Sequence, residues 1–320
     1  MTNEKRVETA CLLGVLALAA VLRFWRLDAN GFGTEYYAAG VRSMLQSGWL
    51  FLYNAFDPAG MLSLDKPPVA FWIQTLFAFV LGFSGWTIHL PQALAGVASV
   101  ALLHRLVLRP FGPTAALIAA LLLALTPIAV AIDRSNNTDS WLVFFLLLAA
   151  WTAMRGRGLA LVAAMAVLGV AFNVKMLAAL VCGPALLAAW WLSGTLDWRA
   201  RLGWMMAAGV TLVVVGLSWA VVFDLTPRAD RPFAGSTRDN SMLQLIVVHN
   251  GLERFAIDRP RRATANPEAA TEAREMYDAV PVGPLRLAAP TLAGQFGWML
   301  PLAILGFGLA AGFRRRRDQT

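Results

Sequence analysis

Long continuous runs of apolar residues, separated by short polar segments, repeat along the chain. They do not alternate between apolar and polar positions, so they predict helices rather than strands. Helices of about 17–25 apolar residues are long enough to cross a bilayer, where each must satisfy its own backbone hydrogen bonds. The pattern therefore predicts an all-α integral membrane protein. The nine runs lie at about 9–27, 67–83, 88–107, 114–131, 140–154, 159–174, 176–193, 203–223 and 291–312.

The positions of Lys and Arg predict which runs cross the membrane. If the N-terminus is cytoplasmic and the 67–83 run does not cross, twelve basic residues fall on the cytoplasmic side and far fewer on the outer side. If the 67–83 run crossed, the later basic segments would change sides, against the positive-inside rule. We therefore predict eight spanning helices, with both termini in the cytoplasm. The twelve are Lys5, Arg6, Arg105, Arg109, Arg155, Arg157, Arg199, Arg201, Arg314, Arg315, Arg316 and Arg317.

This topology predicts one transmembrane domain over residues 1–313, followed by a basic cytoplasmic tail at 314–320. A first outer loop, at 28–87, would contain interfacial helices, including the 67–83 run. A last outer loop would cover 224–290. The first apolar run has no small-residue cleavage site, so we expect a retained helix rather than a cleaved signal peptide.

Composition agrees with a membrane protein and argues against a nucleic-acid-binding one. Hydrophobic residues make up 58% of the chain and charged residues 14%, whereas soluble domains carry about a quarter charged residues. The net charge of +8 comes from Arg and Lys between the apolar runs, which is typical of topology signals and of contact with anionic lipids. Two cysteines within apolar runs and three scattered histidines predict neither a disulfide framework nor a metal site, and we expect no cofactor.

Three polar clusters lie on the predicted outer side, where charged groups are costly unless they are solvated or paired. Cations there could hold a lipid phosphate and stabilise it as a leaving group. A carboxylate could take the proton from an acceptor hydroxyl. We select Lys66, Arg134 and Lys175 as candidate phosphate ligands and Glu35, Asp139 and Asp133 as candidate catalytic carboxylates. Weaker candidates are Asp65, Tyr36, Asn137 and His249.

At this point the sequence resembles a known family. Its motifs are similar to those of bacterial protein O-mannosyltransferase-like membrane glycosyltransferases, which have the GT-C fold and include the aminoarabinose transferase that modifies lipid A. The resemblance covers nearly the whole chain in the same order. The matching stretches are Glu35-Tyr-Tyr-Ala38, Leu64-Asp-Lys-Pro-Pro68, Phe71-Trp72, His89-Leu-Pro-Gln-Ala-Leu94, Asp133-Arg-Ser-Asn-Asn-Thr-Asp139, Phe172-Asn-Val-Lys-Met176, Arg231-Pro-Phe-Ala-Gly-Ser236, His249-Asn-Gly251 and Gly294-Gln-Phe-Gly-Trp298.

The resemblance implies a role for three residues. Glu35 would be the catalytic carboxylate of the first loop, Lys66 would bind the lipid phosphate, and Asp139 would be a second essential carboxylate. The chain departs from the family in having Thr34-Glu35 where many relatives have an acidic pair, and relatives are usually longer. The implied activity is inverting transfer of a hexose or pentose from a polyprenyl-phosphate donor to an envelope protein, polymer or lipid, outside the plasma membrane.

Each candidate residue also has a structural reading. Glu35 and Asp139 could cap helices, and Asp65 with Lys66 could form an interfacial ion pair. Lys175 could extend its ammonium to the lipid headgroups, and Asp133 with Arg134 could be a surface pair. The alternative function is a lipid-glycan transporter or a scaffold subunit, as a truncated family member. A transporter would place charges near the bilayer midplane, whereas these charges lie at one face.

Overall fold

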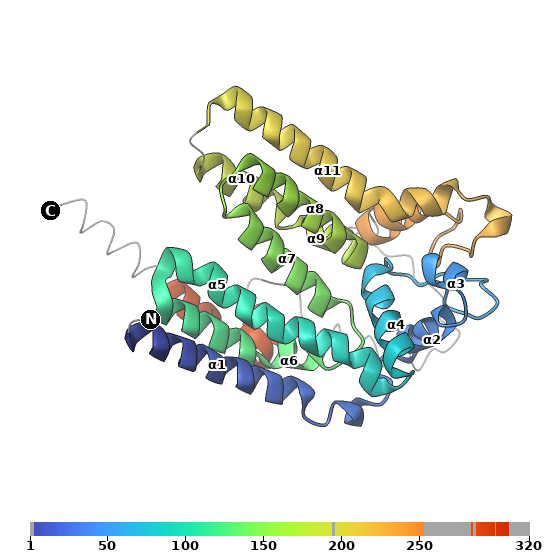
Figure 1. Cartoon of the computed structure of the whole chain (residues 1–320). Coiled ribbons are helices and arrows are strands. Elements are labelled where there is room, and N and C mark those ends of the chain that lie inside the picture. Colours follow the sequence, from blue (N-terminus) through green and yellow to red (C-terminus); the bar gives the residue numbers. More distant parts are fainter. Residues whose placement is uncertain (1–2, 194–195, 253–282, 284–285, 298, 307–320) are drawn as a thin grey trace. The chain divides into compact units, whose positions relative to one another are not determined.

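The structure is a computed structural model, and it describes residues 3–193, 196–252, 283, 286–297 and 299–306. Helices make up nearly all of the regular structure in these residues (Figure 1). The chain divides into two compact units, residues 1–125 with 129–257 and residues 126–128 with 258–320. The first unit contains every described residue of the candidate site. In the second, the described elements include η4 (Arg286–Ala288), α15 (Pro290–Leu292) and η5 (Ala293–Gly297), and residues 299–306 are also helical.

Within the described residues of the first unit, four helices are long and apolar enough to cross a membrane, by length and composition. They are α1 (Asn3–Phe24), α5 (Gly85–Leu125), α8 (Gly158–Lys175) and α11 (Trp198–Leu225). Shorter apolar helices lie between them, namely α7 (Asp139–Ala153), α9 (Leu177–Leu180) and α10 (Gly183–Ser193). The all-helical membrane fold is confirmed, whereas the number of eight crossings stays a prediction.

The 41 residues of α5 would extend for about 60 Å as a straight helix, twice the thickness of a bilayer core. The chain instead reverses at Gly112, whose φ of 82° suits glycine and interrupts the helix. The two arms then pack together, since Val97 and Val100 of the first arm share one apolar cluster with Leu123 and Ala124 of the second. The single α5 therefore supplies the apolar run at 88–107 and most of the run at 114–131, whose last residues lie in α6.

The 67–83 run forms α4 (Val69–Leu81), which has 13 residues. At 1.5 Å per residue this helix is about 20 Å long, short of the roughly 30 Å hydrocarbon core. It packs on α2 (Glu35–Met44), where Phe71 is fully buried together with Val41, Leu64 and Ile88. Its length and packing agree with the predicted interfacial position within the first loop, which also holds η1 (Leu27–Asn30) and α3 (Gly48–Leu52).

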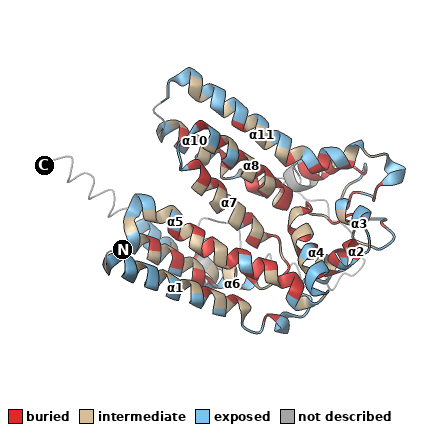
Figure 2. Ribbon diagram, in the orientation of Figure 1, coloured by how far each residue is buried: buried red, intermediate tan, exposed pale blue. Residues whose placement is uncertain are grey.

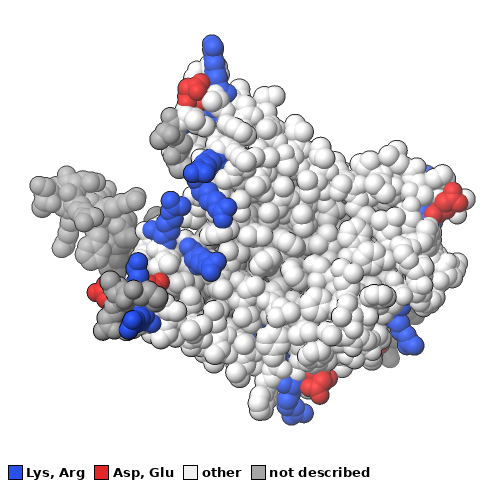
Figure 3. Space-filling model, viewed as in Figure 1, with Lys and Arg blue, Asp and Glu red and all other residues white. Residues whose placement is uncertain are grey.

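The surface of the first unit suits an apolar surrounding. Figure 2 shows exposed residues along much of α1 and α11, and many of these are large and apolar, such as Leu13, Val21, Val210 and Val213. On the face shown in Figure 3, charged side chains gather toward the ends of the helices and leave a broad uncharged band between them. A wide exposed apolar band of this kind marks a membrane-facing surface.

A buried ion pair joins the C-terminal end of α1 to the end of α6 (Pro127–Asp133). Arg23 donates from Nε to Asp133 Oδ2 at 2.8 Å, and the two side chains are 0% and 9% exposed. The Arg23 guanidinium also donates to the carbonyl of Ala124. Gly96 of α5 lies directly against this pair, and a methyl group there would overlap both the carboxylate and the guanidinium. The pair is therefore enclosed on the α5 side.

We expect Gly96→Ala to destabilise the protein by about 3 kcal/mol or more, because a buried ion pair that is forced apart leaves charges without compensation. Thermal unfolding of the purified protein in detergent would measure the change. Gly209→Ala in α11 is the matched control, since its methyl group would meet no atom within 4 Å. Equal melting midpoints for the two variants would contradict the proposed importance of the pair.

Candidate active site

Two ion pairs between a lysine and an aspartate lie at the end of the first unit where its loops meet. Lys66 Nζ is 2.5 Å from Asp65 Oδ2, just before α4 begins. Lys175 Nζ, at the last residue of α8, is 2.5 Å from Asp139 Oδ1, at the first residue of α7. All four side chains are between 15% and 27% exposed. Each ammonium is thus held in place and still open to a ligand.

Two tyrosines of α2 connect these ion pairs. The backbone N–H of Asp65 donates to the Tyr36 hydroxyl at 3.2 Å. Burial, followed by the charge of Asp65, raises the pKa of Tyr36 to about 12. Burial also raises the pKa of Tyr37, with further contributions from Asp65, Tyr36 and Asp139. Carboxylates of both ion pairs therefore contribute to the raised pKa of Tyr37. Both phenols stay protonated at neutral pH and can donate a hydrogen bond to an anionic ligand.

Glu35 is the first residue of α2, and it is exposed. Among the described residues its side chain makes no hydrogen bond or ion pair, which leaves the carboxylate available to a substrate. The preceding residue is held firmly, because Asn136 Oδ1 accepts from the Thr34 N–H at 2.8 Å and Asn136 Nδ2 donates to the Thr34 carbonyl at 2.9 Å. Asn136 is itself fully buried, and its carbonyl accepts from Gln74 of α4. This contact fixes where α2 starts and hence where Glu35 lies.

Three predicted site residues have contacts that favour a structural role. Asp133 is engaged in the buried pair with Arg23. The Arg134 guanidinium donates to four backbone carbonyls, those of residues 22, 23, 25 and 26, and so caps the end of α1. Asn137 Oδ1 accepts from the N–H groups of Thr138 and Asp139 at the start of α7. We therefore leave these three out of the proposed chemistry, and their predicted site roles stay untested.

Tyr37 and Asn136 were not predicted as residues of this region, and the predicted His249 cannot be placed. Tyr37 follows Tyr36 in the same motif, and only the direction of the helix shows that both face the ion pairs. Asn136 and Asn137 are chemically alike in a polar run, so the sequence could not tell which of them holds the first loop. The side chain of His249 lies outside the described residues. Among those that are described, no three His, Cys, Asp or Glu side chains form a group that could hold a metal.

Sequence comparison extends this picture beyond the chain itself. The family model described as "Dolichyl-phosphate-mannose-protein mannosyltransferase" matches residues 65–219, a range that includes both ion pairs. A protein of Bacillus subtilis (strain 168) named "Putative mannosyltransferase YycA" is 43% identical over 257 residues, covering 79% of this chain and 37% of that protein. A second, "Putative mannosyltransferase YkcB", is 42% identical and covers 80% and 36%. The chain spans about a third of the length of these curated relatives.

The fold also matches solved structures of ArnT from Cupriavidus metallidurans. The apo structure aligns with a TM-score of 0.55 and 25% identity, covering 67% of this chain and 42% of ArnT. The structure bound to undecaprenyl phosphate aligns with a TM-score of 0.57 and 22% identity, covering 76% and 44%. The resemblance noted from the motifs is confirmed: the chain is similar to the GT-C membrane glycosyltransferases of the protein-mannosyltransferase type.

We expect Asp139→Asn and Lys175→Gln each to change the free energy of unfolding by less than about 1 kcal/mol, because partly exposed ion pairs contribute little stability. Asp133→Asn should lower it by about 3 kcal/mol or more, since it leaves Arg23 buried without its partner. Denaturant unfolding in one detergent would compare the three variants. A loss at Asp139 as large as the loss at Asp133 would assign Asp139 to the fold rather than to the site.

Proposed function

We propose that this chain carries the active site of an inverting glycosyltransferase that moves a sugar from a polyprenyl-phosphate donor to a hydroxyl group of a cell-envelope acceptor. The observation that carries the proposal is the pairing of Lys66 with Asp65 and of Lys175 with Asp139 around Tyr36 and Tyr37. Two ammonium groups and two protonated phenols in one region suit a phosphate monoester or diester. The family match supports the same class of reaction.

An apolar groove next to this region supports a lipid-linked donor. It encloses about 300 Å³ and is lined by residues of α3, α4, α8 and α11, among them Val69, Trp72, Val170 and Trp219. Val69 and Trp72 follow Lys66 by three and six residues, and Asn173 of the groove precedes Lys175 by two residues. The groove thus lies beside the lysines that would hold the phosphate, and it fits the first isoprene units of the donor. The ArnT structure with undecaprenyl phosphate shows that this fold can hold such a lipid.

In the proposed reaction, the oxygen of the acceptor hydroxyl attacks the anomeric carbon from the face opposite the phosphate. The bond between that carbon and the phosphate oxygen breaks, and its electron pair leaves with the polyprenyl phosphate. Lys66 and Lys175 stabilise the charge that develops on this leaving group. The proton of the hydroxyl passes to a carboxylate, either Glu35 or Asp139. One displacement inverts the configuration of the anomeric carbon.

We place this chemistry on the outer face of the plasma membrane. The order of the helices along the chain puts the loops that carry Glu35, Lys66 and Asp139 at one end of the helices. It puts the basic segments around Arg105, Arg155 and Arg199 at the opposite end. The positive-inside rule assigns those basic segments to the cytoplasm. The sugar and the acceptor belong to the classes expected from the sequence, a hexose or pentose and an envelope protein, polymer or lipid.

Lys66→Ala should weaken the binding of undecaprenyl phosphate by about tenfold or more, because a charge-assisted contact contributes roughly 1.5–3 kcal/mol. Glu35→Gln should leave that binding unchanged, since it removes no phosphate ligand. Of Glu35→Gln and Asp139→Asn, the variant that removes the proton acceptor should abolish transfer. Binding would be measured by calorimetry with the protein in nanodiscs, and transfer with a radiolabelled polyprenyl-phosphate sugar and membrane acceptors. Arg155→Ala, in a basic segment at the other end of the helices, is the control for a lost positive charge. Unchanged affinity in Lys66→Ala would count against the enzyme and favour a scaffold.

Val170→Phe should narrow the groove and weaken binding of the long-chain lipid several-fold, while a short-chain polyprenyl phosphate binds as before. Val213→Phe is the matched control, because Val213 is 57% exposed on α11 and does not line the groove. Competition between undecaprenyl phosphate and citronellyl phosphate would measure the difference. An equal loss for both lipids, or no loss for either, would exclude the groove as the site of the lipid chain.

A further inference from the structure

The segment that leads into Lys66 is paired with a distant part of the chain. Phe233 N–H donates to the Met61 carbonyl at 2.8 Å, and Ser63 N–H donates to the Phe233 carbonyl at 2.9 Å. These bonds make a short parallel bridge between Leu62 and Phe233. Gly235 N–H adds a bond to Ser63 Oγ at 3.1 Å. Residues 231–236, which we name the 231–236 strap, therefore hold residues 61–64 through backbone groups.

The contact at Gly235 leaves no room for a side chain. A methyl group at this position would overlap the backbone carbonyl oxygen of Ser63, which cannot move without shifting the segment that carries it. Ser63 and Leu64 are both fully buried. Asn54 holds the same segment from the other side, since its carbonyl accepts from Leu64 N–H and its Nδ2 donates to the Lys66 carbonyl, both at 2.9 Å. A displacement at Ser63 therefore reaches Lys66 across only three residues.

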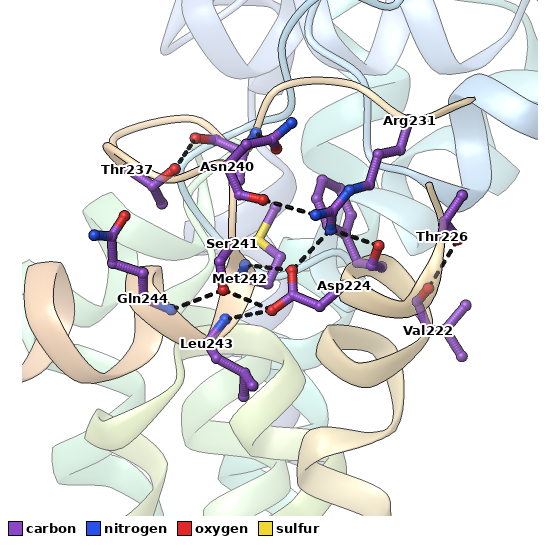
Figure 4. A network of polar contacts seen from close by, with 12 residues as sticks. Val222, Asp224, Thr226, Arg231, Thr237, Asn240, Ser241, Met242, Leu243 and Gln244 are labelled. Atoms are coloured by element: carbon purple, nitrogen blue, oxygen red, sulfur yellow. Dashed lines mark hydrogen bonds and ion pairs between the residues drawn. The ribbon is translucent and has the colours of Figure 1, made fainter. Parts of the chain in front are cut away.

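The other end of the strap is anchored to the end of α11, as Figure 4 shows. Arg231 donates from Nη1 to Asp224 Oδ1 at 2.8 Å and from Nη2 to the Asn240 carbonyl at 2.8 Å. Asn240 Oδ1 in turn accepts from Ala234 N–H at 2.8 Å. The Arg231 side chain is 4% exposed. These contacts close residues 231–240 into a loop that cannot shift relative to α11 without breaking buried polar bonds.

The Asp224 carboxylate is the common acceptor of this anchor. Besides Arg231, it accepts from Ser241 Oγ at 2.7 Å and from the N–H groups of Met242 at 2.8 Å and Leu243 at 3.1 Å. Two of these donors belong to the first turn of α12 (Met242–Gln244). Unpaired N–H groups at the start of a helix favour a negative partner. The carboxylate thus fixes both ends of the 231–240 loop at one point.

We propose that the 231–236 strap is a positioning element for Lys66, and that Gly235 is the residue through which it acts. The strap does not touch the donor in this proposal. It fixes the position of the Ser63–Leu64 segment and thereby the position of the Lys66 ammonium. The inference rests on the proposed function only in taking Lys66 as the ligand of the donor phosphate.

Gly235→Ala should weaken the binding of undecaprenyl phosphate about tenfold to a hundredfold, since a shift of about 1 Å in a positioned group has effects of this size. Calorimetry with the full chain in nanodiscs would measure it. Gly209→Ala is the matched control, because it makes the same change where no atom lies within 4 Å. Phe233→Ala is a second control, as the strap pairs through the backbone of Phe233 and its side chain is 40% exposed. Both controls should bind the lipid like the wild type.

A double-mutant cycle with Lys66→Ala separates positioning from general damage. If the strap acts through Lys66, Gly235→Ala should cause no further loss of affinity in the Lys66→Ala background. An equal loss in both backgrounds, or wild-type affinity in Gly235→Ala, would overturn the proposal. Should Gly235→Ala fail to fold, Ser63→Ala is used in the same cycle, since it removes the hydroxyl that accepts from the Gly235 N–H and donates to the Leu64 carbonyl, and leaves the backbone pairing in place. Unchanged affinity in Lys66→Ala alone would instead refute the proposed function.

Discussion

The buried ion pair between Arg23 and Asp133 is the interaction on which the candidate site depends. It ties the end of α1 to the loop that follows α6, and the next residue, Arg134, caps α1 from the same loop. Two residues further on, Asn136 holds the backbone of Thr34. Each contact satisfies a polar group that would be costly to leave unpaired beside lipid. Together they place the first loop beside the segment between α6 and α7, and the positions of Glu35, Lys66 and Asp139 follow from that placement.

Much of the fold could be predicted from the sequence. The apolar runs identified the helices. The positive-inside rule predicts that the 67–83 run stays at the interface, and this position stays a prediction. The reversal inside α5 was implied by two runs on either side of Arg109 and Gly112. The sequence did not show where a long apolar run is interrupted. Residues 176–193 form two short helices rather than one, because a break between Leu180 and Gly183 depends on packing that apolarity does not reveal.

The candidate site was predicted only in part, and the reason is physical. From the sequence, Lys66, Asp139 and Lys175 were expected on the same side of the membrane. The structure pairs Lys175 with Asp139, and Lys66 with its neighbour Asp65. The sequence could not show that Asp133 and Arg134 face the interior and the end of α1, because a charged residue in a polar loop has several possible partners. Nor could it show that Asn136 and the 231–236 strap hold the first loop, since such contacts use backbone groups that every sequence has. The family motifs include Asn136 and residues 231–236, but they do not indicate that these residues hold the first loop.

The pairing of Lys175 with Asp139 has a consequence for the order of events under the proposed function. In the empty site the ammonium and the carboxylate neutralise each other, so neither is at its most reactive. A phosphate that takes the ammonium would free the carboxylate, which is then open to the acceptor hydroxyl. Donor arrival would in this way prepare the base, and an acceptor that came first would meet a carboxylate still occupied. Steady-state kinetics of such an enzyme would show compulsory order, with the lipid bound before the hydroxyl substrate.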